Sequence, residues 1–310
     1  MAAAVERRAP SGTAHRRDRF RRPTVALLLG LLLCAPLPAQ RSPRAAEPHA
    51  AVPSSAPWTS LAPGLEIAFF ELPADESPKD SALTVLRVDP RHWQLRLLCA
   101  SVTAEMPSLT AKQWCELHEL TAATNAGMFA VDGRTHVGYL RNEIHVNSAA
   151  KNQYQSVAAF SPKVSNVPAF RIFDLECTSF DTILKQYDCV VQNLRLIKRP
   201  REDRWSPQPR KWSEAALGED TAGRALLIFC RMPLSMHDFN QLLLSLPLDL
   251  VSAQHLEGGP EAQLYIKHGD FVRECVGSYE TGFLPNDAND TAWRIPNALG
   301  VAPVEETGGR

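Results

Sequence analysis

Short segments of β-type composition recur along the chain, and they constrain its fold more than any other feature. Helical periodicity is clear in only two places, residues 110–120 and 235–246, each behind a hydroxyl side chain that can cap a helix. These capping residues are Thr110 and Ser235. One short strand ends at Thr124, and the other segments of strand composition are 65–72, 82–89, 93–99, 157–161, 169–173, 189–197, 225–230, 251–256 and 263–267.

This order of elements predicts an α+β fold, a single domain with a mixed, mainly antiparallel β-sheet core flanked by a few helices. Three strands in succession at the start suggest a meander. The segment from Lys198 to Gly218 contains three prolines and six Lys or Arg residues. Such a composition predicts a long surface loop that could rim a site.

The first 39 residues have the composition of a signal peptide. Seven arginines between Arg7 and Arg22 precede an apolar run from Val25 to Ala35. Because spanning a bilayer takes roughly 20 apolar residues, we expect no stable membrane span. Residues 40–60, rich in Pro, Ala and Ser, predict a flexible linker, so the folded domain would occupy residues 61–310.

A signal peptide places the protein outside the cytoplasm, in a periplasm or secreted, where disulfides can form. Cys177 with Cys189 is the one pair that we predict, and buried free thiols are the alternative. Lipid attachment at Cys34 would instead make a structural lipoprotein, but the bulky Leu33 before it does not suit small-residue cleavage. The cysteines beyond the signal are Cys99, Cys115, Cys177, Cys189, Cys230 and Cys275.

The charge and the motifs exclude several classes of function. The formal net charge of the whole chain is −1, and removing the basic signal leaves an acidic domain. We therefore expect no nucleic-acid partner. The sequence has no GxxxxGK phosphate loop and no HExxH helix, and its cysteines lack the CxxC spacing of structural zinc sites. Carboxylate and Asn oxygens could hold a divalent cation such as Ca²⁺, although no loop has a recognisable metal spacing.

Two turns at the ends of buried strands carry residues suited to chemistry. In Asn125-Ala126-Gly127, the glycine lets a ligand approach the backbone, and the asparagine supplies a donor and an acceptor. In Glu257-Gly258-Gly259, the freed backbone amides could bind an anion beside a carboxylate. An ordinary turn is the alternative interpretation of each segment.

Two further positions are candidates on composition alone. Arg224 stands before the strand 225–230, where its guanidinium could grip phosphate at two points, unless it is only a solvated strand end. Tyr139, Arg141, Glu143 and His145 alternate after the first turn. They could line one face of a strand, with a solvated outer face as the alternative.

These motifs together resemble the phosphodiester glycosidase family. Residues 114–129 and 137–140 are similar to the family's helix, strand, Asn-Ala/Gly-Gly-Met/Phe-Phe turn and "vG" segment. Residues 191–197 resemble its "QsGPrLv" strand, which supplies Gln192, and residues 256–265 resemble its "LDGGpSsqLY" block. Arg224 falls where the family has an arginine opening a strand. The similarity extends roughly from Leu65 to Val301.

The resemblance implies an exported hydrolase that cleaves the glycosidic bond of a sugar-1-phosphodiester, with a carbohydrate or phosphoglycan as substrate. It implies that Glu257 is the carboxylate near the anomeric carbon and that Asn125 orients the sugar or the backbone. Arg224 would grip the phosphate together with the Gly258 and Gly259 amides. The substrate-binding residues implied in this way are Gly127, Gln192, Gly258, Gly259 and Tyr139.

Three departures from the family pattern favour an alternative function. Glu257 stands where Asp is usual, Asn193-Leu194 replaces Ser-Gly, and Glu261-Ala262 replaces Ser-Ser. The longer carboxylate shifts its oxygens by roughly 1.5 Å, and a misplacement of about 1 Å can cost catalysis ~10²-fold. The alternative is a non-catalytic module of the cell envelope that binds a glycan or phosphoglycan. Both interpretations require residues 125–127, residues 257–259 and Arg224 to meet at one pocket.

Overall fold

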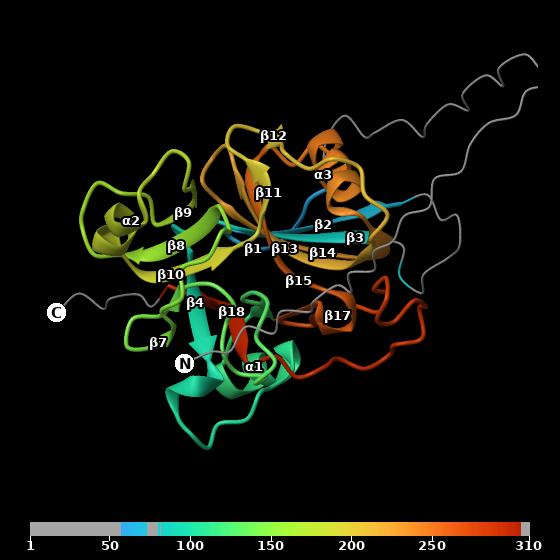
Figure 1. The fold of residues 1–310 in the computed structure, drawn as a ribbon, viewed down its shortest axis with the longest axis horizontal. Coiled ribbons are helices and arrows are strands. Elements are labelled where there is room, and N and C mark those ends of the chain that lie inside the picture. The colour runs from blue at the N-terminus through green and yellow to red at the C-terminus, as the bar shows by residue number, and fades with distance from the viewer. Residues whose placement is uncertain (1–56, 73–79, 81, 305–310) are drawn as a thin grey trace, which may run out of the picture. The chain divides into compact units, whose positions relative to one another are not determined.

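Strands account for most of the regular structure in residues 57–72, 80 and 82–304, which are the residues that the computed structural model describes (Figure 1). They form three sheets, and every strand pairing in this part of the chain is antiparallel. Three α-helices accompany them: α1 (Ala111–His118), α2 (Phe180–Gln186) and α3 (Met236–Ser245). The predicted α+β class with a mainly antiparallel core is confirmed.

The first sheet has eight strands and carries α3 beside it (Figure 1). In spatial order its strands are β1 (Thr59–Ala62), β2 (Leu65–Glu71), β3 (Ala82–Val88), β14 (Ala225–Leu234), β13 (Trp212–Asp220), β15 (Leu250–Gly258), β11 (Arg195–Lys198) and β12 (Glu202–Asp203). Strand β15 therefore has a neighbour on each side, so its backbone position is fixed by two ladders of hydrogen bonds.

The other two sheets have five strands each. The second consists of β7 (Val146–Ser148), β6 (Leu140–Arg141), β10 (Tyr187–Asn193), β8 (Ser156–Pro162) and β9 (Phe170–Asp174). The third consists of β17 (Phe271–Val276), β16 (Gln263–His268), β5 (Ala122–Asn125), β18 (Asn297–Pro303) and β4 (Trp93–Cys99). Two 3₁₀ turns, η1 (Ala100–Val102) and η2 (Gly259–Glu261), follow β4 and β15.

One apolar core is shared by the three sheets. Leu227 of the first sheet, Phe160 of the second and Leu299 of the third belong to the same buried cluster. Each sheet also has a second cluster with one helix: α3 on the first, α2 on the second and α1 on the third. Because both faces of each sheet are covered, many strands are apolar along their whole length rather than alternating.

Both predicted helices are present with the predicted caps. Thr110 and Gln113 form a reciprocal capping box at α1, with distances of 3.2 Å from Gln113 N to Thr110 Oγ1 and 3.1 Å from Thr110 N to Gln113 Oε1. Ser235 Oγ accepts from Asp238 N at 3.1 Å at the start of α3. The third helix, α2, was not predicted.

Two predicted segments differ from the structure. The loop expected at residues 198–218 contains β12 and most of β13, which is buried almost throughout. Strand β13 is rich in Ala and acidic residues instead of β-branched ones, so its composition hides a central strand. The strand predicted at 189–197 is two strands, β10 and β11, which separate at Leu194 and belong to different sheets.

The six cysteines of the described part are free thiols, so the predicted Cys177–Cys189 pair is not formed: Cys177 is exposed and Cys189 is buried. The predicted signal peptide, residues 1–39, lies outside the described residues, as does most of the predicted linker 40–60. Thr59 and Ser60 of that linker belong to β1. Within residues 57–72, 80 and 82–304, no helix has the length and apolarity needed to cross a membrane.

Candidate active site at the end of strand β15

The two predicted turns meet in the structure. Asn125 ends β5, which pairs with β16, and β16 begins just after the Glu257-Gly258-Gly259 turn. The buried amide of Asn125 connects the two segments: Oδ1 accepts from Gln263 N at 2.8 Å, and Nδ2 donates to Glu261 O at 2.9 Å. Asn125 therefore fixes the backbone on both sides of Ala262.

Gly127 allows close packing beside Asn125. Its φ of 150° lies in a region that L side chains rarely adopt, and an added Cβ would lie 2.2 Å from Asn193 Oδ1 and 2.4 Å from His136 Cε1. Asn193 in turn donates from Nδ2 to Ala126 O at 2.8 Å. The asparagine that replaces a small residue of the family pattern thus holds the first turn in place.

A β-bulge directs the end of β15. Ala216 of β13 pairs with His255, but the preceding Ala215 pairs with Glu257, so Leu256 is an extra residue. Bulges of this kind redirect a side chain next to an active site. Glu257 is partly exposed, and its Oε1 accepts from Gly258 N at 3.1 Å.

Although Glu257 is partly exposed, desolvation by the surrounding protein atoms raises the pKa of its carboxyl to about 8. His255 opposes this shift, while Glu261 and Glu214 add to it by charge repulsion. The carboxyl is therefore mostly protonated at pH 7. Tyr154 lies within the electrostatic reach of Glu257, since burial and then the Glu257 charge raise the pKa of the tyrosine.

His255 and Glu214 form a buried pair next to Glu257. His255 Nδ1 lies 2.5 Å from Glu214 Oε1, and Trp212 Nε1 donates to Glu214 Oε2 at 2.6 Å. Burial alone would lower the pKa of His255, but the Glu214 charge and hydrogen bond outweigh it and leave that pKa raised. The pair therefore favours an imidazolium that offsets part of the negative charge at the site.

The two glycines let acidic and aromatic side chains approach the turn. A Cβ on Gly258 would lie 2.7 Å from Trp212 Cδ1. Gly259 has a φ of 65°, and its Cβ would lie 2.6 Å from Glu280 Oε2. Burial raises the pKa of Glu261 to about 6, and the Glu280 charge adds to this shift. Four glutamates, Glu214, Glu257, Glu261 and Glu280, thus surround Gly258-Gly259.

Arg224 does not join this site. It follows the turn after β13, where Nε donates to Asp220 Oδ2 at 2.6 Å. Asp220 pairs with Leu250 at the start of β15, whereas Glu257 pairs with Ala215, five residues further back on β13. At about 3.3 Å per residue, these ends of the sheet are roughly 17 Å apart. The structure therefore places the predicted phosphate grip at the opposite end of β15.

Gln192 is fully buried and makes a framework contact. Its Nε2 donates to Tyr154 O at 2.7 Å and to Asn152 O at 3.1 Å, while its Oε1 accepts from Asn152 N and Tyr139 N. These bonds occupy both donors and both acceptor positions of the amide, so none is left for a ligand. Its effect on the site is indirect, because it holds the segment that carries Tyr154.

Tyr139 belongs to the apolar core of the second sheet. Its ring packs edge-on against Phe180 at 5.1 Å, in the apolar cluster beneath α2. It is a core residue in this structure. Of the predicted residues, the two turns contribute Asn125, Gly127, Glu257, Gly258 and Gly259 to the site. Gln192 supports the segment that carries Tyr154. Arg224 lies at the other end of β15, and Tyr139 lies in the core.

Several residues of the site were not found from the sequence. Glu214 falls in the segment predicted to be a loop. His255, a histidine inside an apolar strand two residues before Glu257, was an available signal. Tyr154 and Glu280 lie in connecting segments that no motif marks. In the described part of the chain, no group of three or more His, Cys, Asp or Glu side chains is arranged to hold a metal ion.

Comparison with known proteins identifies the family of the chain. The sequence profile of the phosphodiester glycosidase family matches residues 118–302, more than half of the chain. The chain therefore belongs to the phosphodiester glycosidase family. No curated protein sequence matches it.

Two solved structures share the fold at low identity. One is the catalytic domain of zebrafish N-acetylglucosamine-1-phosphodiester alpha-N-acetylglucosaminidase, auto-inhibited by its pro-peptide, with a TM-score of 0.55 and 15% identity over 80% of this chain and 86% of that one. The other is a hypothetical protein from Synechocystis, with a TM-score of 0.50 and 15% identity over 76% of this chain and 61% of that one. At this identity the likeness establishes the fold alone.

Proposed function

We propose that the protein hydrolyses the glycosidic bond of a sugar-1-phosphodiester outside the cytoplasm. The observation that carries the proposal is the acidic turn at the end of β15, where a bulge at Leu256 precedes Glu257, Asn125 holds the backbone at Glu261, and the surroundings raise the two carboxyl pKa values to about 8 and about 6. When their surroundings give two carboxyl groups different pKa values, one commonly acts as the acid and the other as the base in glycoside hydrolysis. Membership of the family supports the phosphodiester as the substrate class.

In this mechanism Glu257 acts as the general acid. It donates its proton to the oxygen between the sugar and the phosphate while the bond from that oxygen to the anomeric carbon breaks. Water adds to the anomeric carbon, and the ionised Glu261 accepts the proton that the water loses. The products are the free sugar and the phosphate monoester. A protonated Glu257 also repels the substrate anion less than a carboxylate would.

The pH dependence of turnover tests this division of roles. Activity should rise as pH passes about 6, because Glu261 must lose its proton, and should fall above about 8, because Glu257 must keep its own. The measurement is kcat/KM between pH 4 and pH 10 on the best substrate of a panel of sugar-1-phosphodiesters. A profile that rises through pH 8 would assign the ionised form of Glu257 to the reaction instead.

Removing the acid should remove the activity. Glu257→Gln keeps the shape of the side chain but has no proton to donate, so turnover should fall by at least ~10²-fold. Release of free sugar measures the activity, and far-UV circular dichroism checks folding. Glu274→Gln, at an exposed position of β17, is the matched control and should leave turnover unchanged. If the Glu257 variant keeps full turnover, Glu257 has no part in the mechanism.

The second candidate is a non-catalytic module that binds a glycan or phosphoglycan. Two observations favour it: Arg224 lies far from Glu257, and four glutamates surround the turn that would hold the phosphate. Calorimetric titration of the protein with the same panel separates the candidates. Saturable binding without release of free sugar, in the wild-type protein at every pH tested, would establish the module and exclude the enzyme.

The location outside the cytoplasm rests on the composition of residues 1–39. Expression of the full chain in a host with the export pathway, followed by mass spectrometry of the mature N-terminus, tests it. A start near residue 40 supports the signal peptide, whereas a start at Cys34 carrying the mass of a lipid supports the lipoprotein. An intact N-terminus in the cytoplasm contradicts both.

A further inference from the structure

Two aromatic side chains are exposed in residues 277–296, the segment between β17 and β18. Phe283 is 58% exposed and Trp293 is 37% exposed, and their ring centroids lie 6.0 Å apart with an angle of 80° between the ring planes. In this arrangement the edge of one ring meets the face of the other, so the two rings form a corner of apolar surface. Neighbouring exposed aromatic rings, unlike a single exposed aliphatic side chain, commonly mark a binding site.

Hydrogen bonds hold Trp293 in its exposed position. Its Nε1 donates to Asn289 Oδ1 at 3.2 Å. Asn289 is itself held, because its backbone O accepts from Nη2 of the buried Arg231 at 2.8 Å. The indole has a single polar group, and that group is already bonded, so the ring offers a ligand its apolar surface.

The backbones of both aromatic residues are joined to the candidate site. Gln263 Nε2 donates to Trp293 O at 2.5 Å and to Glu261 O at 3.3 Å, so one amide connects the two backbones. Phe283 N donates at 3.2 Å to the backbone O of Glu280, which is one of the four glutamates of the site. The aromatic corner therefore lies next to the acidic turn after β15.

A pyranose ring has both kinds of surface that this region can bind. The C–H groups on a face of the sugar ring carry a partial positive charge, which is attracted to the negative face of an aromatic ring. The hydroxyl groups at the edge of the sugar are donors, and the carboxyl oxygens of Glu261 and Glu280 are acceptors. Two side chains offer far less area than the roughly 800 Å² that each partner buries in a stable protein interface. A sugar therefore fits this surface better than a protein partner does.

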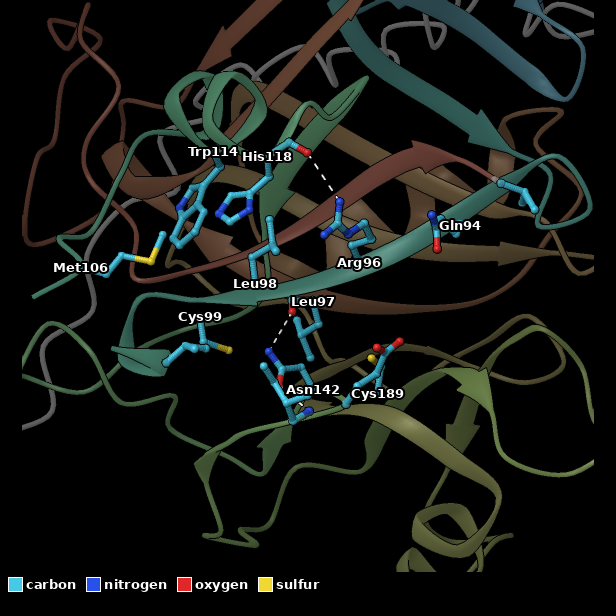
Figure 2. A pocket seen from close by; sticks show the side chains of 14 residues that line it. Gln94, Arg96, Leu97, Leu98, Cys99, Met106, Trp114, His118, Asn142 and Cys189 are labelled. Atoms are coloured by element: carbon cyan, nitrogen blue, oxygen red, sulfur yellow. Dashed lines mark hydrogen bonds between the residues drawn. The ribbon is translucent and has the colours of Figure 1, made fainter. Parts of the chain in front are cut away.

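A cavity of about 640 Å³ beside β4 is the alternative place for a sugar to bind (Figure 2). Its one indole, that of Trp114, is fully buried and stacks on His118 with ring centroids 5.5 Å apart. This indole therefore has little surface left for a ligand. The cavity also shares no lining residue with the site around Glu257.

We propose that Phe283 and Trp293 form a stacking platform for a pyranose ring of the carbohydrate ligand, and that Glu280 accepts hydrogen bonds from the hydroxyl groups of that sugar. The ligand class rests on the function proposed above, although the platform serves the enzyme and the non-catalytic module alike. The two rings supply neither a proton nor a nucleophile. They therefore bind the sugar equally in the ground state and the transition state, so losing them raises KM and leaves kcat nearly unchanged.

The first test measures kcat and KM on the best sugar-1-phosphodiester of the panel. Trp293→Ala should raise KM at least roughly tenfold and change kcat less than about twofold. Trp293→Phe keeps an aromatic face and should recover most of the loss. Val102→Ala, at a 41% exposed position that lines the cavity beside β4, is the matched control and should change neither constant. If the wild type turns over and Trp293→Ala leaves KM unchanged, the platform is wrong and the proposed function stands.

The second test needs no turnover. In phosphonate analogues of the panel, carbon replaces the glycosidic oxygen, so the protein has no glycosidic bond to cleave. Saturation-transfer-difference NMR with the wild type should show the strongest saturation at the ring C–H protons of the sugar, and Trp293→Ala should remove most of it. This result without turnover of the phosphodiesters would support the platform and refute hydrolysis. Equal saturation with both proteins, or no saturation of any analogue, would overturn the platform.

Discussion

At the scale of single residues, Glu257 combines a reactive position with a cost in stability. Its carboxyl binds a proton more tightly in the folded chain than in the unfolded one, because desolvation raises its pKa to about 8 from an ordinary value of 4.5. Between these two pH values the unfolded chain has lost the proton that the folded chain still holds. Stability from this residue is therefore fully present below about pH 4.5 and falls as pH rises through about 8.

Glu257→Gln should consequently stabilise the protein while it removes the activity. The glutamine carries no charge at any pH, so the variant should melt a few degrees higher than the wild type at pH 8, given roughly 2–4 °C per kcal/mol for a domain of this size. The difference should vanish at pH 4.5. Thermal melts followed by circular dichroism at both pH values measure it, and a lower melting temperature for the variant at pH 8 would contradict the raised pKa.

Asn125 illustrates how much a single buried amide can position. Asn125→Ala would leave Glu261 O and Gln263 N buried without these partners, which should cost about 2–4 kcal/mol of unfolding free energy. Turnover should fall as well, because Glu261 would lose its fixed backbone. Urea unfolding and sugar release measure the two effects. An unchanged unfolding free energy would show that the amide does not hold the turn.

At the scale of elements, the sequence predicts the features that depend only on neighbouring residues, such as the starts of helices. Thr110 and Ser235 mark helix starts because their side chains cap the first turn whatever the rest of the fold does. Strand β13 was missed because its burial comes from neighbours on both faces, and no alternation remains in its sequence. The break at Leu194 was missed for a similar reason, since it depends on which sheets β10 and β11 join.

The candidate site was found only in part for the same physical reason. Turns at residues 125–127 and 257–259 stand out in the sequence because glycine and polar side chains follow apolar strands. Their meeting depends on β5 pairing with β16, and the exclusion of Arg224 depends on the antiparallel register of β13 with β15. Spacing along the chain reveals neither the strand pairing nor the register. The sequence therefore gives no reason to separate Arg224 from Glu257.

At the scale of the whole molecule, the buried apolar clusters enclose five of the six thiols in the described part of the chain. Burial raises the pKa of the Cys189 and Cys275 thiols to about 11 and that of three others to about 12, so few thiolates exist near neutral pH. Cys177 is the exposed exception. The three thiols with the highest pKa values are those of Cys99, Cys115 and Cys230.

Thiol labelling of the folded protein should therefore be selective. Iodoacetamide at pH 8 should modify Cys177 quickly and the five buried thiols at least ~10²-fold more slowly, and Cys177→Ser should remove the fast phase. In denaturant without reductant, all six thiols beyond residue 57 should react. Peptide mass spectrometry measures both. A deficit of two thiols in denaturant would reveal a disulfide and contradict the free-thiol state.

Glu257 lies at the end of β15, a strand inside the first sheet, whereas other residues of the candidate site lie in connecting segments. The ladder between β13 and β15 fixes the backbone at Glu257, whereas Gly127, Tyr154 and Glu280 come from the connecting segments 126–139, 149–155 and 277–296. Insertions in those segments leave the ladders intact. Under the proposed function, grafting other loops onto the unchanged scaffold should therefore change which sugar the protein prefers.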